Sequence, residues 1–109
     1  MKRGDVVLIV APGELGKPRP AVVVQADELG DETTAVVVCP MSTDIRQFER
    51  VRPVVSPSAM TGVRVPSQIM TDKIVALPRT RIRRVVGRLD LPARQMLDQA
   101  LLFVLGLAV

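Results

Sequence analysis

The sequence predicts a single, mainly β domain with one C-terminal α-helix. Its 109 residues are enough for one compact domain and too few for two. The chain is 48% hydrophobic but only 2% aromatic, so valine, leucine and isoleucine must build the core, and this composition favours strands. Short apolar runs separated by glycine and proline precede one long stretch with helical periodicity. These features predict a small, strongly curved β-barrel of the SH3-like type with a packed terminal helix, spanning residues 1–109.

Seven short apolar segments are the predicted strands. They cover residues 6–10, 21–25, 34–39, 51–55, 63–65, 74–77 and 82–86. Pro40 is expected to end the third strand, because proline cannot donate a hydrogen bond to a ladder. The polar segment 41–50 is expected to form a short helical turn or an irregular crossover.

Helix signals follow Gly87. Asp90 and Pro92 suit the first turn of a helix, where an acid meets the positive end of the dipole and proline is tolerated. Apolar residues then recur at helical spacing in a stripe expected to cover the strands: Met96, Leu97, Ala100, Leu101, Val104 and Leu105. Further apolar residues widen this stripe and predict a second buried contact, which a homodimer would supply: Leu102, Phe103, Leu107 and Val109.

The charge balance is basic, with 15 lysines and arginines against 11 acids. This excess favours a polyanion or an acidic peptide as partner, although a merely soluble basic surface would fit as well. The first apolar run, residues 6–10, is too short for the core of a signal peptide, and no run is long enough to span a bilayer. We therefore expect a cytoplasmic protein without membrane contact.

The residue types that are missing exclude several kinds of chemistry. The chain has no histidine, which is the commonest general base. Its absence excludes the usual catalytic triads and most zinc sites. Cys39 lies in an apolar run and is expected to be a buried hydrophobe, not a nucleophile. The acids show no ligand spacing, and residues 13–17 lack the Walker pattern. We therefore predict neither a metal site nor a cofactor.

RNA cleavage remains possible, because RNA carries its own nucleophile. Attack by a 2′-hydroxyl on the adjacent phosphate needs a stabilised transition state, a proton acceptor and a proton donor. Arg19 could supply fixed positive charge, and Ser42 or Thr43 could donate a hydrogen bond to the phosphate. Taken alone, however, Arg19 is better explained as a solvated or ion-paired arginine, and the two hydroxyls fit turn or cap positions.

Several segments together resemble the MazF/PemK family of toxins. The likeness begins with Lys-Arg-Gly-Asp-Val at residues 2–6 and with the glycine-bounded loop and valine-rich strand at 13–24. It continues through the strand ending at 38–43 and the segment 67–74, so it covers nearly the whole chain. By this resemblance the family's catalytic residues correspond to Arg19, to Glu14 as the loop acid and to Ser42 as the hydroxyl, with Thr43 as the neighbouring alternative.

The resemblance implies an SH3-like homodimer that cleaves single-stranded RNA at specific sequences and is neutralised by a cognate antitoxin. No metal is needed, and the product carries a 2′,3′-cyclic phosphate. In this mechanism Arg19 stabilises charge, Ser42 donates a hydrogen bond and Glu14 accepts the proton of the 2′-hydroxyl. The residues expected to bind RNA are Lys17, Thr43, Lys73, Arg79 and Arg81.

Two other functions fit the same fold. One is a non-enzymatic toxin of the CcdB type that binds gyrase, and the other is an SH3-like binding module, including a family member that has lost cleavage. Base recognition is expected to rely on hydrogen bonding and shape, because Phe48 and Phe103 are the only aromatic residues available for stacking.

Overall fold

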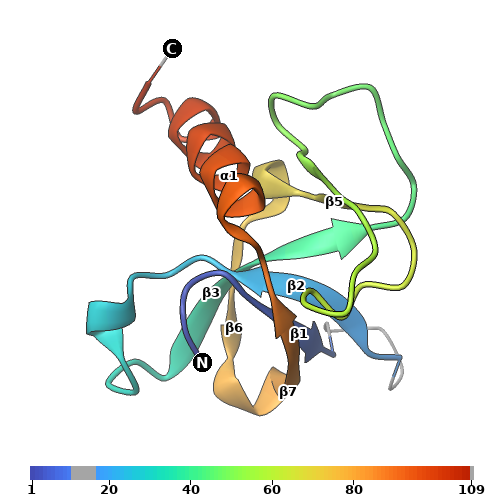
Figure 1. Cartoon of the computed structure of the whole chain (residues 1–109). Helices are drawn as coiled ribbons and strands as arrows, with labels where there is room; N and C mark the ends of the chain where they lie inside the picture. Colours follow the sequence, from blue (N-terminus) through green and yellow to red (C-terminus); the bar gives the residue numbers. More distant parts are fainter. Residues whose placement is uncertain (11–16, 109) are drawn as a thin grey trace.

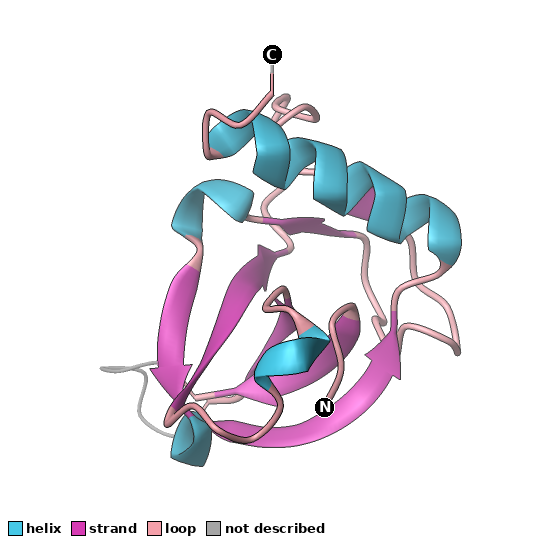
Figure 2. Cartoon of the chain, turned by 90° about the vertical axis from the view of Figure 1, so that its left-hand side faces the viewer, coloured by secondary structure: helices cyan, strands magenta, loops and turns pink. Residues whose placement is uncertain are grey.

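The computed structural model describes residues 1–10 and 17–108. Within these residues the strands are β1 (Asp5–Ile9), β2 (Arg19–Val23), β3 (Ala35–Ser42), β4 (Val54–Val55), β5 (Ser67–Ile69), β6 (Val75–Pro78) and β7 (Ile82–Arg88). Three short 3-10 helices, η1 (Asp27–Leu29), η2 (Thr71–Lys73) and η3 (Arg79–Arg81), lie between strands. The single α-helix, α1 (Leu91–Val104), packs across the strongly curved sheet (Figures 1 and 2).

The strands form one antiparallel sheet in the order β4-β5-β3-β2-β1-β7, with β6 also paired to β3. The first half of β3 pairs with β6, from Ala35 opposite Pro78 to Val38 opposite Val75. The last two residues of β3 pair instead with β5, with Ser42 opposite Gln68. One long strand therefore bends from the larger part of the sheet into the smaller part. This mainly β architecture with one terminal helix confirms the predicted fold class.

Alternating valines supply two hydrophobic cores. Successive side chains of a strand point to opposite faces, so Val6 and Val22 enter one core while Val7 and Val23 enter the other. The first core also contains Leu97 and so lies beneath α1. Both cores consist almost entirely of aliphatic side chains, as the composition predicts.

Helix α1 begins as predicted but buries fewer residues than predicted. The Asp90 carboxylate accepts a hydrogen bond from the backbone N–H of Ala93 at 2.9 Å, and proline occupies the first turn. The buried helical residues are Leu97, Ala100 and Leu101. Met96 and Leu105 are about half exposed, at 48% and 52%, so the predicted stripe was too wide. Only the middle of the stripe faces the first core.

Three of the predicted strands differ from the structure by more than two residues. Pro40 does not end β3, because it pairs with Ala21 and the strand continues to Ser42. The missing N–H is tolerated because Pro40 lies between the β6 ladder, which ends at Val38, and the β5 ladder, which begins at Met41. Residues 63–65, which are described, do not form the predicted strand, and a strand forms at 67–69 instead. Of the predicted strand 51–55, only residues 54–55 are paired. Segment 41–50 is irregular beyond Ser42, which was one of its two predicted forms.

Two glycines bring the loop before β5 against β7. Gly62 has a φ of +71°, and a Cβ there would overlap the backbone of Val86. A Cβ on Gly87 would overlap the carbonyl groups of Met60 and Thr61. The N–H of Arg88 donates to the Met60 carbonyl at 2.9 Å. Backbone packs directly on backbone here, which no larger residue would allow.

Candidate active site

Arg19 and Ser42 lie at the same end of two neighbouring antiparallel strands. Strand β2 begins at Arg19 and β3 ends at Ser42, and each is two residues beyond the paired residues Ala21 and Pro40. Opposite residues of an antiparallel pair share a face, so this register carries Arg19 and Ser42 to one face of the sheet. Arg19 is exposed and Ser42 is half-buried. The structure thus places the two residues expected to act on a phosphate at the same end of neighbouring strands.

The connection from β1 to β2 begins and ends at this same end of the strands. Ile9, the last residue of β1, pairs with Arg19. Glu14, the expected proton acceptor, belongs to this connection and lies outside the described residues, so its role stays a prediction. Lys17 is described, is exposed and stands two residues before Arg19.

The two candidate hydroxyls, Ser42 and Thr43, are placed differently. The Ser42 Oγ accepts a hydrogen bond from the backbone N–H of Asp44 at 3.1 Å. This bond uses a lone pair of the oxygen, so the O–H can still donate to a ligand. Thr43 lines a separate pocket with Pro20 and Arg84. Only Ser42 lines the more strongly charged pocket described next.

An open pocket of about 540 Å³ lies beside Ser42. One wall is the segment of residues 43–53, and the other comes from the end of β5 and from η2. The lining residues are Ser42, Asp44, Arg46, Gln47, Phe48, Arg52, Met70 and Lys73. The pocket is therefore lined both by Ser42, the predicted catalytic hydroxyl, and by Lys73, a predicted RNA-binding residue. Its lining carries three cations against one acid, which suits an anionic ligand.

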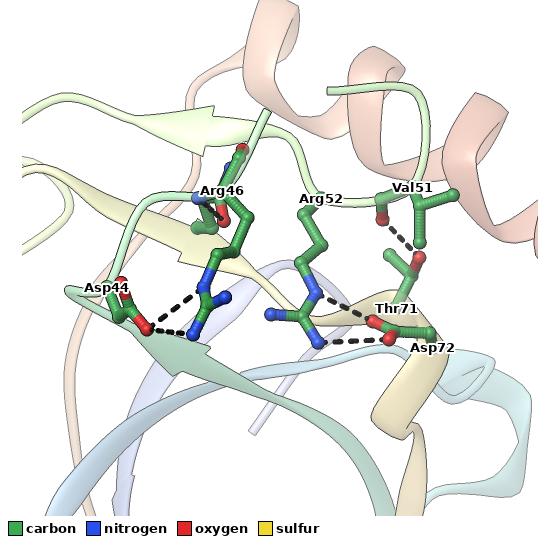
Figure 3. A network of polar contacts seen from close by, with 7 residues as sticks. Asp44, Arg46, Val51, Arg52, Thr71 and Asp72 are labelled. Carbon is green, nitrogen blue, oxygen red and sulfur yellow. Dashed lines mark hydrogen bonds and ion pairs between the residues drawn. The ribbon is translucent and has the colours of Figure 1, made fainter. Parts of the chain in front are cut away.

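Segment 43–53 is irregular, but side chains of β5 and η2 hold it at both ends (Figure 3). At one end, fully buried Gln68 donates through Nε2 to the carbonyl of Arg46 at 2.5 Å and accepts from its N–H at 2.9 Å. At the other end, the Arg52 guanidinium donates twice to the carboxylate of Asp72, both at 3.0 Å. The hydroxyl of Thr71 donates to the carbonyl of Val51. These bonds fix the wall of the pocket without a strand ladder.

The two arginines of the pocket, Arg46 and Arg52, form ion pairs that differ in their exposure to solvent. The hydrogen bonds from Arg52 hold the pKa of Asp72 below its usual range and raise the pKa of Arg52. The charge of Lys73 also lowers the pKa of Asp72. Arg46 is paired with Asp44 through Nε at 3.0 Å and Nη2 at 2.7 Å, and both side chains are about two-thirds exposed. Arg52 is 15% exposed, so its pair is the more enclosed of the two.

Arg79 lies at the other end of β3 from Ser42. The Arg79 guanidinium donates to the carbonyls of Thr33 and Gly30, both at 2.8 Å, and so holds the turn between η1 and β3. Pro78, the residue before it, pairs with the first residue of β3, whereas Ser42 is the last. Arg81 is half-buried, and its carbonyl accepts from the N–H of Val10. An RNA contact by Arg79 would require its present bonds to be exchanged.

Cys39 is fully buried in the first core, as expected. Burial raises the pKa of its thiol to about 12, so the thiol is protonated at neutral pH and is a poor nucleophile. Among the described residues, no three histidine, cysteine, aspartate or glutamate side chains gather into a group that could hold a metal ion. No helix in the described ranges is both long and apolar enough to cross a membrane.

Three residues of the pocket were missed by reasoning from the sequence: Arg46, Gln47 and Arg52. They lie in or beside the polar segment that was expected only to connect two strands, and Phe48 of the same segment was considered only as one of two aromatic residues. The signal available was an aromatic residue among charged residues in a segment without strand or helix periodicity. Gln68, which anchors Arg46, lies within segment 67–74 of the family resemblance, and nothing in the sequence indicated this contact.

The chain matches known proteins along almost its full length. A family model described as PemK-like, MazF-like toxin of type II toxin-antitoxin system matches residues 2–105. A relative from Mycolicibacterium smegmatis, named probable endoribonuclease MazF, is 37% identical over 109 residues, which is 99% of either chain.

Solved structures have the same fold at lower identity. The Mycobacterium tuberculosis toxin MazF-mt6 superposes with a TM-score of 0.81 at 22% identity, over 96% of this chain and 99% of that one. An endoribonuclease in complex with its cognate antitoxin, from a mycobacterial species, gives 0.83 at 19% identity, over 100% and 98%. A MazE-MazF structure from Deinococcus radiodurans gives 0.76 at 20% identity, over 97% and 96%. At these identities the likeness establishes the fold.

Proposed function

Because this chain belongs to the PemK-like, MazF-like toxin family of type II toxin-antitoxin systems, we propose that it cleaves single-stranded RNA at specific sequences without a metal. Membership of this family supports an endoribonuclease toxin over a gyrase-binding toxin or an SH3-like binding module. The observation that carries the proposed chemistry is the placement of Arg19 and Ser42 at the same end of the neighbouring strands β2 and β3.

The proposed reaction is a transesterification within the RNA. The 2′-oxygen forms a bond to the adjacent phosphorus while the bond to the 5′-oxygen breaks, which leaves a 2′,3′-cyclic phosphate. The leaving 5′-oxygen takes up a proton from water and becomes a 5′-hydroxyl. The Arg19 guanidinium stabilises the added negative charge, and the Ser42 hydroxyl donates to a non-bridging oxygen. Arginine has a pKa above about 12 and is a poor proton acceptor, so we assign proton removal from the 2′-hydroxyl to Glu14.

The proposed RNA path follows the basic residues on either side of this centre. Lys73 would bind phosphate from the pocket beside Ser42, and Lys17 is exposed close to Arg19 in the chain. Thr43 lines the neighbouring pocket with Arg84. Arg79 and Arg81 are retained as further contacts for RNA.

We assign two protein partners, a second copy of the chain and an antitoxin. Apolar side chains on the outer face of α1 and just after it are exposed, with Leu107 at 71%, and a second copy would cover them: Leu102, Phe103, Leu105 and Leu107. Val109, which was expected to join them, lies outside the described residues. A structural neighbour was solved with its cognate antitoxin, which supports neutralisation by such a protein. An RNA target of this kind fits action in the cytoplasm.

Sequencing the 5′ ends of RNA fragments, together with analysis of their end groups, tests the function. Purified protein is incubated with RNA in the presence of EDTA, and we expect a 2′,3′-cyclic phosphate, or the 3′-phosphate it hydrolyses to, at specific sites. Arg19→Ala should lower the cleavage rate by about 10²- to 10³-fold, as expected for the loss of a charge-stabilising donor. Arg94→Ala, an exposed arginine of α1, is the matched control and should leave the rate unchanged.

Two results would contradict this function. A 5′-phosphate at the new ends would exclude attack by the 2′-hydroxyl. Toxicity that survives Arg19→Ala while cellular RNA stays intact would favour the gyrase-binding alternative.

A further inference from the structure

Phe48 presents an aromatic ring to the pocket beside Ser42. It is one of only two aromatic residues in the chain, and it is 56% exposed. The other, Phe103, is covered on one face by the Arg50 guanidinium, 3.8 Å from the ring centroid. A ring that is more than half exposed contributes little to the core, and its free face is available for stacking with a ligand.

The backbone of Phe48 is held in place. Its carbonyl accepts from the N–H groups of Val51 at 2.9 Å and Arg52 at 2.7 Å, and its own N–H donates to the carbonyl of Arg46 at 2.8 Å. Arg46 is in turn fixed by Gln68. The ring is therefore carried on a short turn that is already ordered, and a ligand stacking on it would lose little entropy in ordering the protein.

The groups around the ring match the parts of a nucleotide. Phe48 offers a flat apolar face for a base, and the amide of the adjacent Gln47 can both donate to and accept from the edge of a base. Lys73 supplies positive charge on the opposite wall. The volume of about 540 Å³ falls within the range of small-ligand sites, roughly 300–1,000 Å³.

Arg46 and Arg52 have different roles in this pocket. The pair between Arg52 and Asp72 is the more enclosed and anchors the wall. The pair between Arg46 and Asp44 is about two-thirds exposed at both side chains, and exposed pairs contribute little to stability. Arg46 can therefore exchange the Asp44 carboxylate for an RNA phosphate without loosening the fold.

We infer that this pocket holds the base of a nucleotide that flanks the scissile phosphate, stacked on Phe48 with its edge recognised by Gln47. The inference rests on the proposed function and identifies residues that determine which sequence is cut. It also assigns stacking a larger part in base recognition than the low aromatic content predicts, because Phe48 lines the pocket next to Ser42.

Binding and cleavage are measured separately to test this inference. The binding probe is a fluorescent pool of random single-stranded RNA with 2′-O-methyl groups, which cannot be cut because the nucleophile is blocked. Phe48→Ala should weaken binding about 5- to 150-fold, the range for the loss of one stacked base. Phe48→Trp, which keeps an aromatic ring at this position, should bind the probe like the wild type. Ile45→Ala removes an exposed apolar side chain of the same segment that does not line the pocket, and it should bind like the wild type.

Cleavage of unmodified random RNA then tests specificity. Phe48→Ala and Gln47→Ala should each relax the base preference at one position beside the cut, whereas Ile45→Ala should keep the wild-type preference. Thermal melting of each variant checks that the fold is intact, as expected for exposed residues. The inference is overturned if Phe48→Ala binds and cuts with wild-type affinity and preference.

The two proposals fail in different ways. If the wild type binds the probe but leaves unmodified RNA intact, and Phe48→Ala loses binding, the pocket is correct and the proposed chemistry is wrong. If the wild type cuts RNA and Phe48→Ala cuts it with the same preference, the chemistry stands and the pocket is wrong.

Discussion

The side-chain amide of Gln68 is paired with both backbone groups of Arg46, accepting from its N–H at 2.9 Å and donating to its carbonyl at 2.5 Å. A strand neighbour would satisfy a backbone in the same way. Gln68 is fully buried, and no buried side-chain nitrogen or oxygen of the described residues is left without a hydrogen bond. One side chain thus ties an irregular segment to β5 and completes the polar part of the core.

Gln68→Leu should lower the free energy of unfolding and disturb the pocket together. Losing the two hydrogen bonds should cost about 1–3 kcal/mol, because each contributes roughly 0.5–1.5 kcal/mol net. Denaturant unfolding measures this loss. Gln95→Leu, at an exposed position of α1, adds the same apolar side chain without removing these bonds and should change stability by less than about 0.5 kcal/mol. Equal effects of the two substitutions would show that Gln68 does not anchor the segment.

Gly87→Ala should destabilise the protein more than Gly106→Ala does. A Cβ at Gly87 would overlap two backbone carbonyls, and such overpacking costs about 1–3 kcal/mol or more. Gly106 has a φ of +73° but no atom within 4 Å of its Cβ position, so alanine there meets only backbone strain of about 1–2 kcal/mol. Melting temperatures of the two variants give the comparison. A Gly87→Ala variant that melts with the wild type would mean that the loop and β7 do not pack as described.

Leu97→Ala should cost about 2–5 kcal/mol of unfolding free energy, because Leu97 is fully buried where α1 meets the first core. Leu105→Ala removes the same atoms from a position that is 52% exposed in the monomer and should cost clearly less. Unfolding at several protein concentrations distinguishes the fold from the proposed dimer. A cost at Leu105 that grows with concentration would indicate that this residue is covered by a second copy, while a small cost at Leu97 would contradict the packing of the helix.

Stability should fall in alkaline solution because of Cys39. Burial raises its pKa to about 12 in the folded state, while an unfolded thiol has its ordinary pKa near 9. Between these values the unfolded chain binds fewer protons, so the free energy of unfolding decreases as pH rises, by roughly 1.4 kcal/mol per pH unit for this one group. The chain has no tyrosine to titrate in the same range.

Cys39→Ala is the control for this effect. Its unfolding free energy should depend less steeply on pH above 9 than that of the wild type, whatever the cost of the smaller side chain. Identical slopes for the two proteins between pH 9.5 and 10.5 would contradict the buried, protonated thiol.

Local pattern predicts most of the fold. Alternating valines, glycine- and proline-rich turns and the capped helix all act over a few residues, so strands β1, β2, β6 and β7 and helix α1 are recognisable from the sequence. The errors come from tertiary context. Pro40 remains in a strand because its missing N–H falls between two ladders. Met96 is exposed because α1 buries only the side that carries Leu97, Ala100 and Leu101.

The candidate site, like the fold, could be predicted from the sequence only in part. Arg19 and Ser42 could be selected because they flank recognisable strands and match a family pattern. The pocket beside them depends on contacts between segments about 20 residues apart, such as Gln68 with Arg46 and Arg52 with Asp72. Such long-range contacts leave no periodic pattern in the sequence from which they could be predicted. The sequence also did not indicate the structural role of Arg79, whose guanidinium holds a turn at the other end of β3.

Segment 43–53 is fixed at its two ends and open in its middle. The anchors are buried or ion-paired groups that the barrel also needs, whereas Gln47, Phe48 and Glu49 are exposed and contribute little to the core. Mutations at these three positions are therefore nearly neutral for folding while they alter the surface offered to a ligand. A toxin built in this way could acquire a new cleavage sequence by one or two substitutions, and its scaffold would not have to change with it.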